Sequence, residues 1–275
     1  MASSIPRERT IEALREEWAS IADLLDRISD DEWSKPTPLP GWDVHDNVAH
    51  IIGTESMLAG EPAPEQEADR EASPHVRNDI GVFNEGWIDS LRGKTPDEMR
   101  SLFAELTTTR LAALDAITQE AWDEVTFTPA GQDTHGRFMQ IRVMDCWMHE
   151  QDIRDAVGRP GNAVGLPCEV MLDEVETALG FVVGKKAGVA PGQSVTFALT
   201  DDGAVVREIH VAVAERAAVV ESLPGPATTT LTMPIGVMTR RCAGRVAPED
   251  LREEISIAGD ADIAERVLSN QAYTL

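Results

Sequence analysis

The chain has 275 residues, 42% of them hydrophobic, and its 48 acidic and 24 basic side chains give a formal charge of −24 at pH 7. Binding to nucleic-acid phosphates or to an anionic membrane surface needs an excess of Lys and Arg, so this charge argues against both kinds of partner. The length suits one large domain or two ordinary ones, and three widely separated cysteines give neither a disulfide framework nor a CxxC motif.

The beginning of the chain bears on location. Residues 1–9 lack the apolar core of a signal peptide. No apolar run approaches the roughly 20 residues that a membrane-spanning helix needs. We therefore expect a cytoplasmic protein that acts as a monomer or a homodimer.

The first half of the chain reads as helices joined by loops. Residues 6–30 place apolar side chains at the helical spacing of three and four: Ile11, Leu14, Trp18, Ile21, Leu24, Leu25 and Ile28. After the proline-rich loop 35–41, Asp43 caps a second predicted helix that ends near residue 59. Residues 60–73 read as an acidic, exposed loop, and 77–91 as a third helix.

Two further helices complete this part. Thr95 followed by Pro96 is a strong start for a helix that reaches about residue 117. The last long helix covers about 137–157 and is stopped by the Gly-Arg-Pro-Gly sequence at 158–161. Long amphipathic helices joined by loops favour a helix bundle, which we assign to residues 1–162.

Residues 163–275 have a different pattern, typical of a smaller α+β domain. The clearest signal is a hairpin, because two strand-like segments flank the Asp-Asp-Gly sequence at 201–203. The predicted elements, in order, are a helix at 167–183, strands at 194–199, 205–213 and 227–232, a helix at 233–243, a short strand at 255–257 and a helix at 260–268.

A candidate metal site lies on two of the bundle helices. Asp145 and His149 are four residues apart and so lie on one helix face, where they can bind one cation together. His50, on the second helix, could complete a set of two imidazoles and one carboxylate, which leaves coordination positions open. Taken alone, such histidines are more often hydrogen-bonded or solvated than metal-bound. Asp46 and Asp152 are candidates to accept the second N–H of a ligating imidazole, although helix-surface or capping roles are as plausible.

Two paired motifs carry a resemblance. Residues 41–50 read G-W-x-V-x-D-x-x-x-H, and residues 149–160 read H-x-x-D-x-R-x-A-x-G-R-P. The pair resembles the mycothiol-dependent maleylpyruvate isomerase family, within the DinB-like four-helix-bundle superfamily. The stretch from Gly244 to Asp262 resembles the family's second domain, which is similar to sterol-carrier-type α+β folds.

The resemblance implies a site and a cofactor. By motif, His50, Asp145 and His149 take the positions of the family's ligands for a divalent metal, usually zinc, and mycothiol supplies a thiol. The family's carboxylate is commonly Glu, so Asp145 is one methylene shorter. Cys146 follows Asp145 but points about 100° away from it on the helix, and we interpret it as a small buried residue rather than a nucleophile.

The function implied is a metal-dependent thiol transferase or isomerase that acts on a small electrophilic substrate, either neutral or anionic. Arg245 best matches the family's catalytic arginine and could grip a carboxylate. For Arg240 and Arg241 we favour a simpler role as cations at a helix C-terminus. Two other classes stay open: a metal-dependent hydrolase, and a non-catalytic protein that binds a small molecule.

Overall fold

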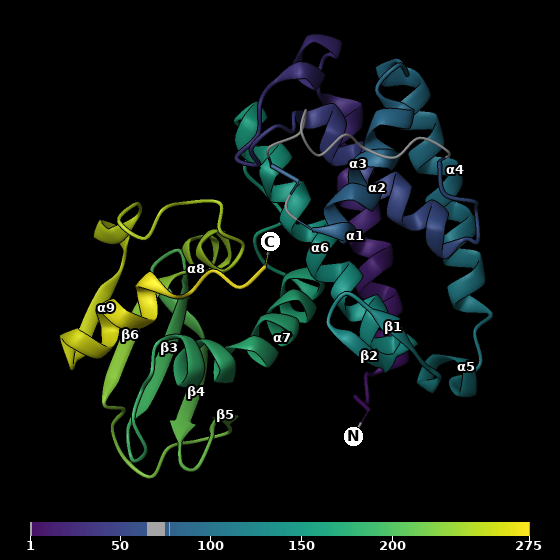
Figure 1. The fold of residues 1–275 in the computed structure, drawn as a ribbon. Coiled ribbons are helices and arrows are strands. Elements are labelled where there is room, and N and C mark those ends of the chain that lie inside the picture. The colour runs from purple at the N-terminus through teal and green to yellow at the C-terminus, as the bar shows by residue number, and fades with distance from the viewer. Residues whose placement is uncertain (1, 65–74, 77, 275) are drawn as a thin grey trace. The chain divides into compact units, whose positions relative to one another are not determined.

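Four long helices form the frame of the first unit in the computed structural model, which describes residues 2–64, 75–76 and 78–274. Helices α1 and α2 each pack against both α4 and α6, which closes a four-helix bundle (Figure 1). The predicted bundle is thus confirmed, with α1 at Arg7–Arg27, α2 at Val44–Leu58, α4 at Pro96–Asp115 and α6 at His135–Val157.

The ends of these helices follow from their capping residues. The side chains of Asp43 and Thr95 accept hydrogen bonds from the backbone N–H of Asp46 and Glu98, which starts α2 and α4 where the sequence predicted. Thr134 caps α6 in the same way, so this helix begins two residues before the predicted 137. Gly158 ends α6 with a left-handed φ of 66°, a conformation that glycine adopts without strain.

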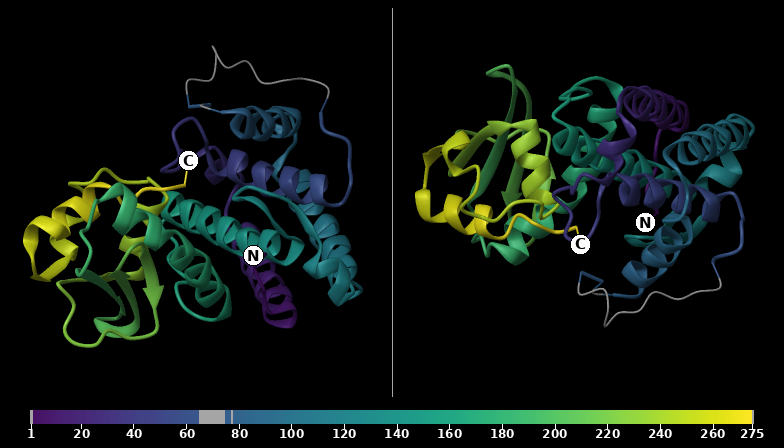
Figure 2. Two further views of the ribbon diagram at one scale, coloured as in Figure 1. Left: turned by 60° about the horizontal axis from the view of Figure 1, so that its bottom comes forward. Right: turned by 90° about the horizontal axis from the view of Figure 1, so that it is seen from above.

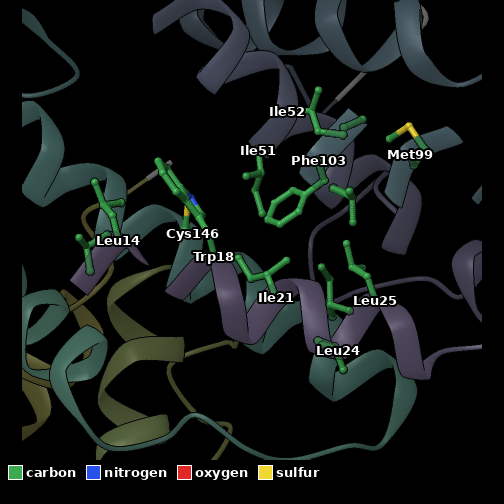
Figure 3. Packing of buried hydrophobic residues seen from close by; sticks show 14 of the residues in the cluster. Leu14, Trp18, Ile21, Leu24, Leu25, Ile51, Ile52, Met99, Phe103 and Cys146 are labelled. Carbon is green, nitrogen blue, oxygen red and sulfur yellow. The ribbon is translucent and has the colours of Figure 1, made fainter. Parts of the chain in front are cut away.

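The core of the bundle is apolar and continuous. Trp18, Ile21 and Leu25 of α1 are at most 2% exposed. Ile21 and Leu25 lie on the side of α1 that faces Ile51 of α2 and Phe103 of α4, and the Trp18 ring lies nearer Cys146 of α6 (Figure 3). Burial of whole aliphatic and aromatic side chains contributes roughly 1.5–3 kcal/mol each, so this core fixes the positions of α2 and α6.

Smaller elements surround the bundle, and most of them lacked a clear signal. Helix α3, Asp79–Leu91, packs on α2 outside the bundle (Figure 2). The sequence did not predict the 3-10 helix η1 (Asp30–Ser34), helix α5 (Gln119–Asp123) or the hairpin of β1 (Val125–Thr128) and β2 (Gly131–Thr134). The hairpin turns at Pro129-Ala130, which is not one of the glycine-containing pairs that mark a tight turn. The predicted loop 60–73 and the predicted helix start at 77 fall largely outside the described residues.

The second unit is a five-stranded sheet with helices, as the α+β prediction required. The strand order is β5-β4-β3-β6-β7, with β3 and β6 parallel and the other neighbours antiparallel. Helices α8 and α9 pack on β6, and α8 also contacts β3. The bounds are α7 at Leu166–Phe181, a π-helical turn η2 at Val182–Lys186, β3 at Ser194–Asp201, β4 at Ala204–Val213, β5 at Ala217–Val220, β6 at Thr229–Pro234, α8 at Ile235–Cys242, a 3-10 turn η3 at Arg252–Glu254, β7 at Ser256–Gly259 and α9 at Ala261–Ser269.

The predicted β3–β4 hairpin is present, and Asp202 and Gly203 form its turn with positive φ values of 45° and 80°. Two compact units divide the chain, Met1–Met171 and Leu172–Leu275, so they separate within α7. The predicted division between residues 162 and 163 precedes that helix and stays a prediction. Among the described residues, no helix combines the length and the apolar character needed to cross a membrane.

Candidate metal site of the helix bundle

Helices α2 and α6 bring the three predicted ligands together. His50 Nε2 lies 3.1 Å from Asp145 Oδ2, and His149 Nε2 lies 3.5 Å from Asp145 Oδ1. The centroids of the two imidazole rings are 4.6 Å apart. Within the described ranges, this is the cluster of three His, Cys, Asp or Glu residues in which one ligand atom from each lies within 4.8 Å of the others. Two imidazoles and a carboxylate that converge in this way fit a divalent cation with open positions.

Burial and neighbouring charges together decide which forms of these side chains are present. His50 and His149 are 6% and 5% exposed, whereas the Asp145 side chain is 28% exposed. Burial lowers the pKa of His50 and outweighs the opposing effect of Asp145. Burial alone would raise the pKa of Asp145, but Arg142, His50 and His149 together hold it well below its usual range. A neutral imidazole and an ionised carboxylate are the forms that bind a metal.

Asn47 fixes the orientation of the His149 ring. Asn47 Oδ1 lies 2.7 Å from His149 Nδ1. The Asn47 amide nitrogen donates to Asp43 O at 2.8 Å and to Thr37 Oγ1 at 3.1 Å, so its oxygen must be the atom that faces the ring. Because an amide oxygen only accepts, Nδ1 carries a proton, and Nε2 is the ring atom that faces Asp145 and would offer its lone pair to a metal in the neutral imidazole.

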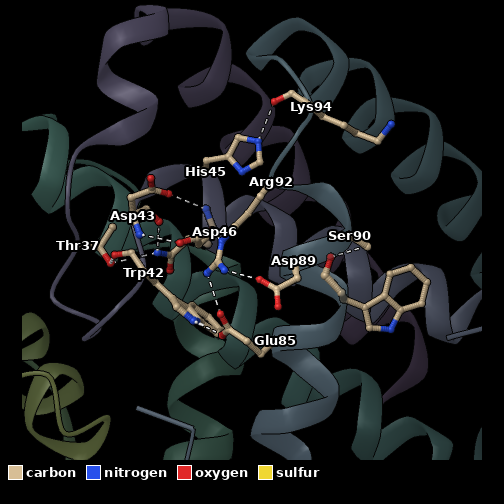
Figure 4. A network of polar contacts seen from close by, with 12 residues as sticks. Thr37, Trp42, Asp43, His45, Asp46, Glu85, Asp89, Ser90, Arg92 and Lys94 are labelled. Atoms are coloured by element: carbon tan, nitrogen blue, oxygen red, sulfur yellow. Dashed lines mark hydrogen bonds and ion pairs between the residues drawn. The ribbon is translucent and has the colours of Figure 1, made fainter. Parts of the chain in front are cut away.

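The two acidic residues considered for this role lie elsewhere in the network. Asp152 Oδ2 is 3.7 Å from His149 Nδ1, an ion-pair distance and longer than a hydrogen bond. Asp46 accepts from Arg92 Nε at 3.1 Å and closes the cap of α2 (Figure 4). Asn47 was not predicted from the sequence, because helical periodicity does not show which polar residue of α2 faces a ring on α6. For the buried His50 Nδ1, the described residues supply no hydrogen-bond partner.

Trp42 forms a wall of the site. Its ring centroid lies 5.3 Å from that of His50 and 5.8 Å from that of His149, with an interplanar angle of 30° to His149. The indole N–H donates to Glu85 Oε2 at 3.1 Å, and Glu85 is 1% exposed (Figure 4). Glu85 is held in turn by Arg92 and by His75. An aromatic ring fixed in this way gives one side of the site an apolar surface and limits the access of water.

Asn47 yields the first testable prediction. In the Asn47→Ala variant, His149 loses the acceptor that fixes its tautomer, so we expect metal affinity to fall by about 10–100-fold, the range typical for partners of ligating histidines. A competition titration with a chelating dye measures this change. The Thr37→Val variant removes a hydroxyl that bonds to Asn47 but leaves the imidazole contact in place, and it serves as the control. Unchanged affinity in Asn47→Ala would contradict the role of Asn47.

The other residues considered from the sequence have structural contacts. Cys146 is buried beside Arg142, and burial raises the pKa of its thiol, in keeping with its predicted inert role. His135, which precedes the predicted helix start at 137, is the first residue of α6.

Arg245 and its neighbours belong to the second unit. Arg245 Nη1 donates to Ala243 O at 3.0 Å, at the C-terminal end of α8. Arg241 is 2% exposed and donates to the carbonyl oxygens of Pro248 and Leu268 at 2.8 and 2.7 Å. Arg241 lies in the last turn of α8, as predicted for a cation at a helix C-terminus, and its hydrogen bonds also tie α8 to later segments. A catalytic role for Arg245 stays a prediction.

The fold and the site define a class: a helix bundle that presents two histidines and a carboxylate from two adjacent helices, joined to an α+β domain. Residues 14–154 match the profile of the mycothiol maleylpyruvate isomerase N-terminal domain. The chain belongs to this family. The predictions of the family and of an enzyme are thereby confirmed.

Solved structures agree with this assignment at the level of the fold. The crystal structure of a mycothiol-dependent maleylpyruvate isomerase is 18% identical, with a TM-score of 0.58, and the match covers 92% of this chain and 93% of that one. A mutant of such an isomerase gives the same TM-score and coverage at 17% identity. The similarity therefore extends over both units. No match was found among curated proteins.

Proposed function

We propose that the chain is a metal-dependent thiol transferase or isomerase that uses mycothiol, with His50, Asp145 and His149 as the metal ligands. The observation that carries this proposal is the convergence of both Nε2 atoms on the Asp145 carboxylate, at 3.1 and 3.5 Å, in a chain of this family. A divalent cation such as zinc, when bound there, supplies an open position that favours the thiolate form of a thiol.

The surrounding residues prepare the site for this chemistry. Asn47 keeps the His149 lone pair available, and Arg142 keeps Asp145 ionised. Trp42 covers both imidazoles on one side, which limits the approach of solvent to the ligands. An enclosed polar site strengthens charge interactions, because few water molecules screen them. The proposed substrate is a small electrophile, and an anionic one would be favoured if Arg245 contributes to the site.

Metal analysis combined with thermal shift tests this function. The purified protein should contain one divalent cation per chain, and mycothiol should raise its melting temperature, since a ligand that binds only the folded state stabilises it. A protein with one metal and no response to thiols, which hydrolyses esters or amides, would instead be a metal-dependent hydrolase. A protein that binds no metal would contradict the proposal.

Arg245 provides a separate prediction about the second domain. Arg245→Lys keeps the positive charge but loses the planar, two-pronged donor, so turnover of an anionic substrate should fall by about tenfold or more at unchanged metal content. The matched control is Arg240→Lys, the same substitution at an arginine of α8, and its turnover should stay within about twofold of the wild-type value. Equal turnover in both variants would remove Arg245 from the active site.

A further inference from the structure

Three side chains form a buried line of charges behind the candidate metal site. Arg110 of α4 donates from Nε to Glu55 Oε2 at 2.9 Å, and Arg142 of α6 donates from Nε to Glu55 Oε1 at 2.8 Å. Glu55 of α2 is 1% exposed, Arg142 2% and Arg110 5%. Burying three charges is costly, and a buried arrangement is retained only when each charge is paired in good geometry.

Arg142 connects these buried charges to Asp145, one of the candidate metal ligands. Arg142 Nη1 forms an ion pair with Asp145 Oδ2, while Arg142 Nη2 lies 3.3 Å from Cys146 Sγ. The three nitrogens of one planar guanidinium thus contact Glu55, Asp145 and Cys146. Since a guanidinium is rigid, its bond to Glu55 fixes the angle at which it meets Asp145.

The contact with Arg142 differs for the two oxygens of Asp145. Oδ2 accepts from Arg142 and faces His50, whereas Oδ1 faces His149 Nε2 at 3.5 Å. The Asp145 carboxylate therefore cannot turn freely about its Cβ–Cγ bond.

We propose that Glu55 and Arg142 are positioning residues of the metal site: Glu55 orients and neutralises Arg142, and Arg142 holds one oxygen of Asp145 so that the carboxylate faces both imidazoles. This inference rests on the proposed metal site. It assigns a role to two buried residues that would not touch the metal or the substrate. Without Glu55, Arg142 would keep its ion pair with Asp145 but lose its second carboxylate partner, and the added positive charge beside a bound cation would weaken the binding of that cation.

A purely structural role would have a different signature. If the charges only joined α2, α4 and α6, their loss would lower the melting temperature and leave metal affinity unchanged. Arg110 offers the matched control, because it binds the same carboxylate as Arg142 from the opposite side. Arg110→Lys keeps a cation next to Glu55 and leaves the contact between Glu55 and Arg142 in place.

The test measures two quantities for the wild type, Glu55→Gln, Arg142→Lys, the double variant and Arg110→Lys. One is the zinc dissociation constant of the full chain, from competition with a chelating dye, and the other is the melting temperature of the metal-free chain. We expect Glu55→Gln and Arg142→Lys each to weaken zinc binding by about 10–100-fold, as for other residues that orient ligands. The double variant should lose less than the product of the two effects, because both residues act through one contact. The zinc dissociation constant of Arg110→Lys should stay within about threefold of the wild-type value, even if its melting temperature falls as much as that of the other variants.

Other outcomes would overturn the inference. Arg142→Lys with the zinc affinity of the wild type would show that Asp145 needs no support, and this variant decides the matter if Glu55→Gln fails to fold. An equal loss of affinity in Arg110→Lys would show a general effect of stability. A wild-type chain that binds no zinc or other divalent cation would refute the proposed function itself and the inference with it, whereas a normal wild type with unaffected variants would refute the inference alone.

Discussion

The His149→Ala variant should bind no metal under conditions in which the wild type holds one divalent cation per chain. In the wild type, Asp145 and His149 lie one turn apart on α6 and are held together by that helix. The variant loses this pair and keeps only His50 and Asp145, which come from different helices. We expect metal affinity to fall by at least about 100-fold, because loss of a residue that only orients a ligand can already cost that much. Elemental analysis after dialysis measures the change.

The fold should survive this substitution. His149 is buried, and its removal leaves the Asn47 oxygen without its partner, at a cost of about 1–3 kcal/mol. Far-UV circular dichroism should therefore keep its helical signal. The matched control is His45→Ala, which removes a histidine of α2 that contacts Lys94 O at 3.1 Å, outside the metal site. Equal metal content in His149→Ala and the wild type would show that the site lies elsewhere.

Mycothiol should bind the metal-loaded protein and should not bind after the metal is removed by a chelator. A free thiol has a pKa of about 8.5 and is mostly protonated at pH 7, whereas a metal binds the thiolate. Binding should thus release close to one proton per chain at pH 7. Calorimetry in two buffers of different ionisation enthalpy measures this release.

A mycothiol analogue that lacks the sulfur atom is the control for this experiment. It keeps the rest of the mycothiol molecule but offers no sulfur to the metal, so its affinity should be the same before and after chelation and as low as that of mycothiol for the metal-free protein. Equal binding of mycothiol itself in both states would refute direct coordination of the thiol. Binding that depends on metal but releases no proton would mean that the thiol does not bind as the thiolate.

Local sequence signals predicted much of the bundle and part of the site. Asp43, Thr95 and Pro96 mark helix starts by their own chemistry, and Asp145 and His149 share a face because of the helical repeat. These features involve residues close in sequence. His50 was a candidate third ligand, but the helical repeat could not show that it approaches Asp145, because the two residues are 95 positions apart in the sequence.

The remaining features depend on contacts between distant segments. The parallel pairing of β3 with β6 requires a crossover whose geometry the strand pattern does not contain. Glu55 and Arg142 read as ordinary charged residues of amphipathic helices, and only the packing of α2, α4 and α6 buries them together. Arg241 had a plausible local role at the end of α8, yet the structure gives it carbonyl partners up to 27 residues away.

Direct observation of the metal's ligands tests the central claim. X-ray absorption at the zinc edge of the loaded protein should show nitrogen and oxygen ligands alone in the absence of thiol, because His50, His149 and Asp145 supply no sulfur. On addition of mycothiol, one sulfur should enter the coordination shell at about 2.3 Å, the usual zinc–thiolate distance. A shell that stays free of sulfur at saturating mycothiol, or one that holds sulfur before the thiol is added, would contradict the proposed site and its chemistry.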